Sequence, residues 1–578
     1  MSKLSLFKAL TAVSAGLAAC AASVALAQDS GWNRGGDHLA RNRHVLLISI
    51  DGMHAVDLKN CMSAGTCPNL SALAHTGVNY TSASTSKPSD SFPGLMAIVT
   101  GGSPKLVGVY YDVAYDRVLA PPAATTGNGL LAGTCVPNVA NGTRTEYEEG
   151  DDYDQTYLNG VNGGTSTYGR YDGTVHAIDP QKLVRDPYKN CAPVYPWNFI
   201  RANTIFGVIH AAGGYTAWSD KHAVYAAVSG PTGTAVPSNL DDFYGPEINS
   251  NPIPLPGVKT ADGLDCSTIP NNNGGDWTGD FDNIKCYDQL KVNAVLHWID
   301  GENHLGTAQA SVPNVFGMNF QAVSVGQKLI ETINGVAVKG GYLDGAATPS
   351  DALEGDIKFV DDAIGQFVRE LKSRHLYDST TIIITAKHGQ SPIDPKRFLP
   401  IPGHSGANGT PPSGVLGPDY LPDSELNQIG PTEDDVSLLW LKPDASTTDA
   451  VNLLESNGSA IGLGQILYGP QLAMMFGKPG LPADGGDPRT PDIIVTPNVG
   501  VVYTGSTKKQ SEHGGFALDD TNVIMLVSNP WLPARTVDSP VATLQVAPTI
   551  VAMLGIDPSK LLAVRKEGTA VLPDLDLH

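Results

Sequence analysis

The stretch TTIIITAKHGQSP, residues 380–392, contains the run most typical of a β-strand in the whole chain, at 381–385. Five consecutive β-branched residues favour a strand that is buried on both faces of a sheet. The polar residues Lys387, His388 and Gly389 follow this strand almost at once. Because open α/β sheets bind ligands beyond the carboxyl ends of their strands, we expect Lys387 and His388 to lie at a functional site.

Strand-like and helix-like segments alternate along most of the chain. Helical patterns cover 67–77, 94–101, 287–300, 354–376 and 541–555, and strand patterns cover 44–51, 215–222, 314–324, 435–442, 492–497 and 522–528. This alternation predicts an α/β fold: a doubly wound, mostly parallel sheet with helices on both faces.

Three loop-rich stretches interrupt the alternation, near 120–200, 225–285 and 395–432. The chain has 63 Gly and 42 Pro among 578 residues, and only 16% of its residues are charged. Such a composition favours long ordered loops over disorder. We therefore expect one domain over 28–578 with three large loop insertions.

The N-terminus has the pattern of a secretory signal peptide. Lys3 and Lys8 precede a run of small and apolar residues, and the sequence ALA at 25–27 is an A-x-A cleavage signal. We predict that residues 1–27 are removed on export, which would place the mature protein in the periplasm or outside the cell. An alternative is lipoprotein cleavage, which would leave Cys20 as a lipid anchor. No later run of about twenty apolar residues predicts a membrane span.

Six of the seven cysteines follow the predicted signal peptide. An even number in an exported protein favours disulfides over free thiols, and the lack of paired C-x-x-C motifs disfavours a zinc cluster. Of the fifteen possible connectivities, we predict nearest-neighbour pairing: Cys61–Cys67, Cys135–Cys191 and Cys266–Cys286.

The chain carries a formal net charge of −21 at pH 7. A protein with this excess of acidic residues repels nucleic-acid phosphates over most of its surface, so nucleic-acid binding is not expected. A local basic pocket for a small anionic ligand remains compatible with this charge.

Four residues at expected strand exits or helix starts have side chains suited to metal-assisted chemistry. Asp51 ends the first strand and precedes a glycine, as a cation ligand or a turn-capping residue would. Ser91 begins a helix, either as its N-cap, a role that Ser89 or Asp90 could fill equally well, or as a nucleophile whose alkoxide the helix amides stabilise. His388 and His513 each precede a glycine after a strand, and imidazole together with carboxylate suits zinc. Together with Asp51, the two histidines predict a metal cluster.

The motifs LLISIDG, SFPGLMAIVTGG, KHG, EHGG and VATLQVAPTIVAMLGIDP occur in the order found in the alkaline phosphatase superfamily. The set most resembles the type I phosphodiesterase/nucleotide pyrophosphatase family, over roughly 44–115 and 285–556. In that family the nucleophile stands directly before Phe-Pro-Asn, and the following helix ends in Val-Thr-Gly. Here the corresponding sequences are SFPG at 91–94 and VTG at 99–101.

The resemblance implies an alkaline phosphatase-like fold and a role for each candidate. Asp51 and His388 would ligate one metal ion, Ser91 would bind that ion and attack phosphorus, and His513 would ligate a second ion. The chemistry is consistent, because a bound cation lowers the pKa of a serine hydroxyl and offsets the charge on a transferring phosphoryl group.

Three positions depart from the family pattern. Lys387 stands where the family has a metal-ligating Asp, and Gly94 stands where it has Asn. The strand at 314–324 is not followed by the family's Asp-x-x-x-His. Asp300 and His304 have that spacing but precede the strand, so we expect them at the opposite edge of the sheet, as a helix-terminal Asp and a loop His. We therefore expect one divalent metal ion, zinc, rather than two.

A lysine in place of a metal ligand suggests that the protein itself supplies positive charge. We expect the Lys387 ammonium to bind a phosphoryl oxygen or to stabilise the leaving group beside the remaining metal ion. Lys221, at another strand exit, is expected to assist, with Asp220 orienting it. The alternative for Lys387 is a side chain that points into solvent.

These observations predict an exported, metal-dependent phosphoric ester hydrolase, a phosphodiesterase that acts on a small-molecule phosphoester through phospho-Ser91. The alternative is a binding protein that has lost catalysis, which the missing ligands favour and the four retained candidates disfavour. A sulfatase is disfavoured because Leu95 stands where the C/S-x-P-x-R maturation motif has Arg. Phosphomonoesterase activity remains open, because no residue fixes the number of ester groups.

Overall fold

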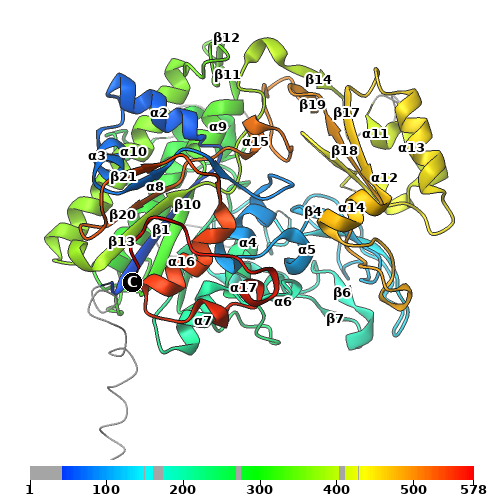
Figure 1. Cartoon of the computed structure of the whole chain (residues 1–578), viewed down its shortest axis with the longest axis horizontal. Coiled ribbons are helices and arrows are strands. Elements are labelled where there is room, and N and C mark those ends of the chain that lie inside the picture. The colour runs from blue at the N-terminus through cyan, green and yellow to red at the C-terminus, as the bar shows by residue number, and fades with distance from the viewer. Residues whose placement is uncertain are drawn as a thin grey trace, which may run out of the picture.

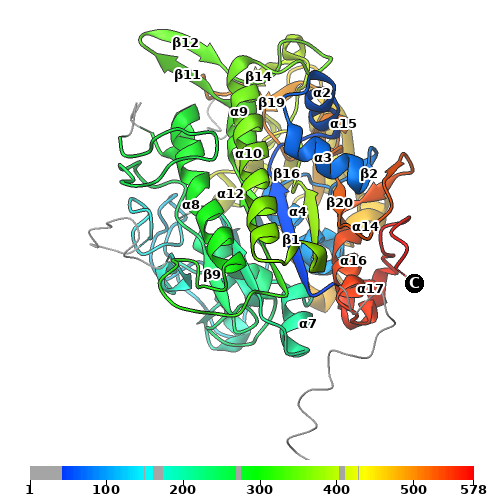
Figure 2. The same cartoon turned by 90° about the vertical axis from the view of Figure 1, so that its left-hand side faces the viewer.

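The computed structural model describes residues 42–148, 150–160, 173–268, 275–402, 411–426 and 429–577. The predicted signal peptide and Cys20 lie outside the described residues. The fold is shown in two perpendicular views in Figures 1 and 2.

A large mixed sheet forms the centre of the described chain. Its eight strands, in spatial order, are β21 (Arg535–Val537), β2 (Val78–Tyr80), β20 (Leu526–Ser528), β13 (Thr380–Thr385), β1 (His44–Ile50), β10 (Val315–Phe320), β8 (Ala217–Ser219) and β9 (Asp242–Tyr244). Only β20 runs antiparallel to its neighbours, and all the other adjacent pairs are parallel. The prediction of a mostly parallel α/β sheet is confirmed.

Strand β1 shows why this sheet is covered on both faces. Val45 and Leu47 belong to one hydrophobic cluster, whereas Leu46, Ile48 and Ile50 belong to another on the opposite face. Successive side chains of a strand point to opposite faces, so a continuous apolar run needs two covering layers. The predicted helices on both faces of the sheet are therefore confirmed.

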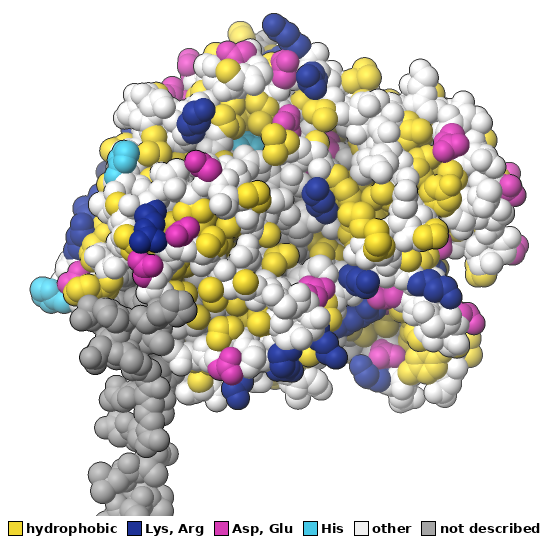
Figure 3. Space-filling model, in the orientation of Figure 1, with side chains coloured by type: hydrophobic (Ala, Val, Ile, Leu, Met, Phe, Trp, Pro, Cys, Tyr) yellow, Lys and Arg dark blue, Asp and Glu magenta, His cyan; other side chains and the backbone are white. Residues whose placement is uncertain are grey.

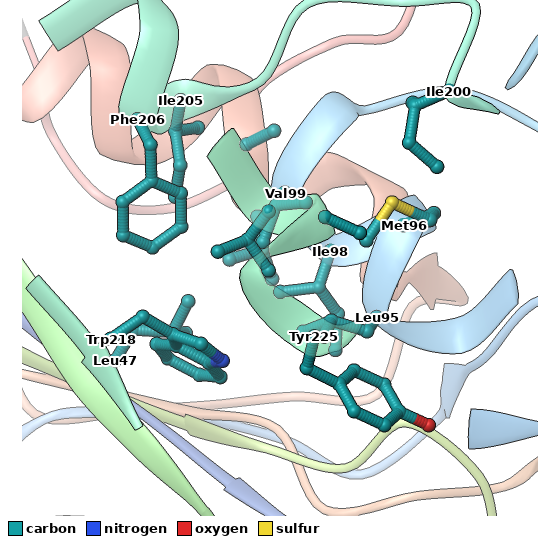
Figure 4. Packing of buried hydrophobic residues seen from close by; sticks show 14 of the residues in the cluster. Leu47, Leu95, Met96, Ile98, Val99, Ile200, Ile205, Phe206, Trp218 and Tyr225 are labelled. Atoms are coloured by element: carbon teal, nitrogen blue, oxygen red, sulfur yellow. The ribbon is translucent and has the colours of Figure 1, made fainter. Parts of the chain in front are cut away.

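Each face of the sheet is covered by its own set of helices. One layer contains α3 (Pro68–Thr76), α8 (Phe281–Ile299) and α10 (Asp351–Ser373), and the other contains α4 (Ser91–Thr100), α7 (Ile205–Ala211) and α16 (Val546–Met553). Figure 2 shows α8 and α10 side by side along the sheet. Figure 4 shows Leu95, Ile98 and Val99 of α4 packed with Trp218 and Tyr225 in the second layer. This packing fixes α4 against the sheet.

Two of the predicted strands lie outside the central sheet. A separate antiparallel sheet consists of β15 (Thr432–Glu433), β16 (Ser437–Leu439), β18 (Ile493–Pro497) and β17 (Leu463–Tyr468). The strands expected at 435–442 and 492–497 are found here, packed against α11 (Pro412–Tyr420) and α13 (Thr447–Ser456), at the right of Figure 1. A strand pattern predicts extended backbone but not the partner strand, which explains the difference.

The remaining elements are short or lie at the periphery. They are α2 (Ala55–Ala64), α5 (Pro104–Val107), α6 (Pro196–Phe199), α9 (Ala322–Lys328), α12 (Asp423–Leu426), α14 (Gly469–Phe476), α15 (Leu518–Thr521), α17 (Leu562–Glu567), the 3₁₀ helix η3 (Ala223–Ser229), and the strands β3 (Ala83–Ser84), β4 (Val113–Asp116), β5 (Thr143–Glu146), β6 (Arg185–Asp186), β7 (Ala192–Pro193), β11 (Ile330–Ile333), β12 (Val336–Lys339), β14 (Leu399–Ile401), β19 (Val501–Tyr503) and β22 (Val541–Ala542).

All three predicted disulfides are confirmed. The structure joins Cys61 to Cys67, Cys135 to Cys191 and Cys266 to Cys286. Among the described residues, no helix is both long enough and apolar enough to cross a lipid bilayer.

The surface in Figure 3 mixes hydrophobic, polar and charged side chains. Lys and Arg gather mainly toward the lower right of this view, and Asp and Glu lie among them. The basic side chains on this face therefore do not form a continuous patch of the kind that tracks a nucleic-acid backbone.

Candidate active site

Strands β1 and β13 bring two of the predicted residues together at their carboxyl ends. Ser49 pairs with Thr385 in the parallel register, which places Asp51 beside Lys387 two residues later. Lys387 Nζ lies 3.6 Å from Asp51 Oδ2, and His388 Nε2 lies at the same distance from that oxygen. The strand exits thus create a buried cluster of charged groups at one edge of the sheet.

Ser91 faces this cluster from the first residue of α4. Its Oγ lies 3.3 Å from His388 Nε2 and 3.2 Å from Lys221 Nζ. The Ser91 side chain is fully buried. A hydroxyl held between an imidazole and an ammonium has the surroundings that a serine nucleophile requires.

The N-terminus of α4 does not offer free amides to Ser91. Asp90, rather than Ser91, is the N-cap, and its carboxylate accepts a hydrogen bond from Phe92 N at 3.1 Å. Pro93 has no N–H, and Gly94 N donates to the Asp90 carbonyl at 2.8 Å. Within the described first turn of α4, the amides of Phe92 and Gly94 are therefore already bonded to Asp90.

Lys387 is buried at the centre of the cluster. Its Nζ donates to Asp220 Oδ1 at 3.0 Å and lies 4.3 Å from the centre of the Tyr225 ring. The side chain has no exposed surface. The alternative in which Lys387 points into solvent is wrong, and the two carboxylates of Asp220 and Asp51 compensate its charge.

Lys221 has a different partner from the one expected. Its Nζ forms an ion pair with Glu148 Oε1, while the Asp220 side chain accepts from the backbone N of Lys221 and from Lys387. The expectation that Asp220 orients the Lys221 ammonium is therefore wrong. Glu148 follows β5, in the stretch expected to be a loop insertion, and no motif in the sequence marked it as a site residue.

The lysines control the ionisation of the buried acids around Ser91. Burial alone would raise the pKa of Asp51, but the charges of Lys387 and His388 hold it well below its usual range. Burial likewise opposes ionisation of Glu148, and Lys221 holds its pKa well below the usual value. Burial and the Glu148 charge raise the pKa of Asp90 to about 7, and the Lys221 charge offsets only part of this rise.

His513 lies next to His388 rather than at a separate position. Their ring centres are 4.0 Å apart, and His513 Nδ1 lies 3.5 Å from Asp90 Oδ1. Burial and the neighbouring His388 hold the pKa of His513 well below its usual value, which favours the neutral imidazole. A neutral imidazole is the form that binds a metal ion.

The type I phosphodiesterase/nucleotide pyrophosphatase family model matches residues 45–204 and 339–517, more than half of the chain. The chain belongs to this family. It is therefore a phosphoric ester hydrolase of the nucleotide pyrophosphatase/phosphodiesterase type, within the alkaline phosphatase superfamily. No curated protein matches the chain.

Solved structures with a similar arrangement include two ectonucleotide pyrophosphatases/phosphodiesterases of type 5. The murine protein, as an inactive variant in complex with AMP, is 13% identical, with a TM-score of 0.48 over 89% of this chain and 96% of that chain. The human protein is also 13% identical, with a TM-score of 0.46 over 89% of this chain and 95% of that chain.

Gly94 explains one departure from the family pattern. A Cβ atom at this position would lie 2.2 Å from the carbonyl oxygen of Lys387. Real Cβ atoms do not approach a backbone atom so closely, so the family's Asn cannot fit here without moving α4 away from β13. The close approach of α4 to this strand exit therefore requires glycine.

The position after β10, where the family has Asp-x-x-x-His, also carries other residues. Gln321, at the exit of β10, donates its side-chain amide to Asp51 Oδ2 at 2.7 Å. His304 instead bonds Asp242 Oδ1 at 2.6 Å, and Asp300 pairs with Arg374 at 2.8 Å. Asp300 directly follows the last residue of α8, as expected for a helix-terminal Asp.

Members of this family are typically metal-dependent, and the site fits one divalent ion. Asp51 Oδ1 is buried without a hydrogen-bond partner, whereas Oδ2 accepts from Asn319 and Gln321. Asp51, His388 and Ser91 would leave an open coordination position, as catalytic zinc sites do. Within the described ranges, no group of three or more His, Cys, Asp or Glu side chains is arranged to hold a metal ion by itself.

Proposed function

We propose that the chain is an exported, metal-dependent phosphodiesterase that acts through a phospho-Ser91 intermediate. The observation that carries the proposal is the position of Ser91 Oγ, within 3.3 Å of both His388 Nε2 and Lys221 Nζ. Family membership supplies the reaction class, and this geometry supports Ser91 as the nucleophile. The substrate would be a small-molecule phosphoester.

Ser91 would form a bond from Oγ to phosphorus while the bond from phosphorus to one ester oxygen breaks. The first alcohol leaves, and Ser91 carries the remaining phosphoryl ester. Water then attacks phosphorus, releases the phosphate monoester and restores the Ser91 hydroxyl.

Asp51, Ser91 and His388 would hold one divalent ion, which we propose to be zinc, and His513 lies beside them. When bound, such an ion lowers the pKa of a coordinated hydroxyl and offsets charge on the transferring group. Asn319 and Gln321 hold the Asp51 carboxylate in position through its Oδ2.

Lys387 would supply the charge that the family obtains from the missing ligand position. Its ammonium is fixed between Asp220 and Asp51, so it needs little reorganisation to stabilise an anionic phosphoryl or leaving group. This role makes Lys387 a catalytic residue together with Ser91.

Export is supported by two features. The N-terminal segment 1–27 has the composition of a signal peptide, and the three disulfides fit an oxidising compartment. We propose that the mature domain covers 28–578, with its insertions near 120–200, 225–285 and 395–432.

The test is hydrolysis of an aryl phosphodiester by the mature protein after dialysis against zinc. Wild type is expected to turn over, and Ser91→Ala is expected to lose at least about a thousandfold in kcat. Ser89→Ala is the matched control, because Ser89 is an equally buried serine two residues away that bonds the Asp520 carbonyl. Equal turnover by Ser91→Ala and wild type would overturn the assignment of the nucleophile.

A further inference from the structure

The carboxylate of Glu148 lies close to the proposed nucleophile Ser91. Its Oε1 contacts Lys221 Nζ, which in turn donates to Ser91 Oγ at 3.2 Å. The same Glu148 oxygen accepts a hydrogen bond from the Tyr225 hydroxyl at 3.1 Å. A carboxylate oxygen therefore lies one ammonium away from the proposed nucleophile.

A phosphoryl group attached to Ser91 would need a cation where the Lys221 ammonium lies. Within the described part of the chain, the Lys221 ammonium contacts Ser91 Oγ directly, and its partner is an anionic oxygen. Carboxylate and phosphoryl oxygens form the same type of charge-assisted hydrogen bond with an ammonium. The Glu148 carboxylate and a bound phosphoryl group would compete for Lys221.

Ser91, Glu148 and Lys221 are buried, so an incoming ligand must displace a side chain to reach Ser91. Ser91 is 0% exposed, Glu148 5% and Lys221 9%. Glu148 follows the two-stranded β4–β5 pair and is not part of the central sheet. Its side chain can therefore turn away without breaking the strand pairs that hold Asp51 and Lys387.

We propose that Lys221 binds the phosphoryl group of the substrate, and that the Glu148 carboxylate takes the place of a phosphoryl oxygen until substrate displaces it. The proposal rests on the proposed function of Ser91 and deepens it. Lys221 becomes a substrate-binding residue, and Glu148 becomes an internal competitor for anionic ligands.

The two residues should therefore act in opposite directions on anion binding. Lys221→Met removes the cation, so the dissociation constant of inorganic phosphate is expected to rise about tenfold or more. Glu148→Gln keeps an oxygen that can accept from Lys221 but removes the competing charge, so that constant is expected to fall severalfold. A Glu148 that merely positioned Lys221 would give the reverse sign.

The experiment is calorimetric titration of the zinc-loaded mature protein with inorganic phosphate, together with phosphate inhibition of aryl phosphodiester hydrolysis. The matched controls are Lys285→Met and Glu331→Gln, a lysine and a buried glutamate far from Ser91 that line a separate pocket. Both controls are expected to bind phosphate as wild type does. If Lys221→Met does not fold, as judged by circular dichroism, Lys221→Gln replaces it with the same expectation.

The calorimetric result separates this proposal from the proposed function. Absence of hydrolysis by wild type would overturn the function, whereas phosphate binding is measured without turnover. Unchanged phosphate affinity in the Lys221 variant, weaker binding in Glu148→Gln, or no phosphate binding by wild type would each overturn the proposal.

Discussion

Two regions of this protein differ in the cations that contact their buried carboxylates. Around Ser91, Asp51 lies against Lys387, and Glu148 lies against Lys221. The second region is a pocket of about 770 Å³ at the N-termini of α8 and α10, here called the acidic pocket. Its charged lining residues are Asp280, Asp282, Lys285, Glu331, Asp351 and Asp356.

The two regions differ in how closely cations approach their buried acids, and the pKa directions follow that difference. The pKa values of Asp51 and Glu148 lie well below their usual range despite burial. In the acidic pocket, neither Asp356 oxygen has a hydrogen-bond partner, and burial raises its pKa well above the usual range. Burial and the neighbouring Asp280 raise the pKa of Glu331 to about 7. Cations contact the buried acids beside Ser91, as the proposed binding of anionic ligands requires.

Removal of metal is expected to have the largest effect, and only on the Ser91 region. Dialysis against a chelator should abolish aryl phosphodiester hydrolysis, because Asp51, His388 and Ser91 would lose the ion that activates the hydroxyl. Elemental analysis of the zinc-restored protein should find about one ion per chain, since Asp51, His388 and Ser91 would form a single ligand set. Full activity in a metal-free sample would contradict this expectation.

Lys387→Met should produce the next largest effect. The variant leaves Asp51 and Asp220 buried without their shared cation, so kcat should fall about a hundredfold or more. The free energy of unfolding should also fall by about 3–5 kcal/mol.

Steady-state kinetics and denaturant unfolding measure both quantities. Lys285→Met is the matched control in the acidic pocket, where the lysine side chain is 13% exposed and pairs with Asp282. It should leave kcat unchanged. A wild-type kcat in Lys387→Met would remove this lysine from the catalytic residues.

Two glycine-to-alanine substitutions, one in each region, should change the free energy of unfolding in opposite directions. Gly94→Ala places a Cβ against the Lys387 carbonyl, so it should lower the free energy of unfolding by about 1–3 kcal/mol and reduce activity. Gly355→Ala, in α10 beside the acidic pocket, meets nothing within 4 Å. It should stabilise the helix by about 0.5–1 kcal/mol. Denaturant unfolding of both variants checks the comparison, and a stabilising Gly94→Ala would contradict the close approach of α4 to β13.

The smallest expected effect is a pH dependence in the acidic pocket. Glu331 keeps its proton up to a pKa of about 7 in the folded protein, against 4.5 for an ordinary glutamate. The folded state therefore binds the extra proton between these values, and the stability that Glu331 contributes is present below pH 4.5 and is lost as the pH rises through 7.

Glu331→Gln cannot ionise, so its unfolding temperature relative to wild type should rise between pH 5 and pH 8. Thermal unfolding at the two pH values measures this difference. A constant difference would show that Glu331 ionises normally in the folded protein.

The central sheet and part of the site could be predicted because both depend on local patterns. The apolar runs that form β1 and β13 are continuous, and polar residues follow each run, so Asp51 and His388 could be placed at one edge. The structure brings His388 to Ser91 and Asp51 to His388. The register of β1 with β13 then brings Lys387 beside Asp51, which the sequence pattern alone did not specify.

Other features depend on tertiary packing and were missed or assigned wrongly. Asp220 was paired with Lys221 because they are neighbours in sequence, but Lys387 binds its side chain in the fold. Glu148 reaches Lys221 only because the β4–β5 pair lies near η3, where Tyr225 contacts both groups. No local signal in the acidic run around Glu148 marks that position.

The most direct test of the account is capture of the proposed covalent intermediate. The zinc-loaded protein would be mixed with excess aryl phosphodiester, quenched in acid within one turnover, digested and analysed by mass spectrometry. The account predicts that the phosphoryl ester is attached to Ser91 and that the adduct is absent from Ser91→Ala. An adduct on another residue, or turnover without any adduct in an assay that detects a synthetic phosphoserine standard, would contradict it.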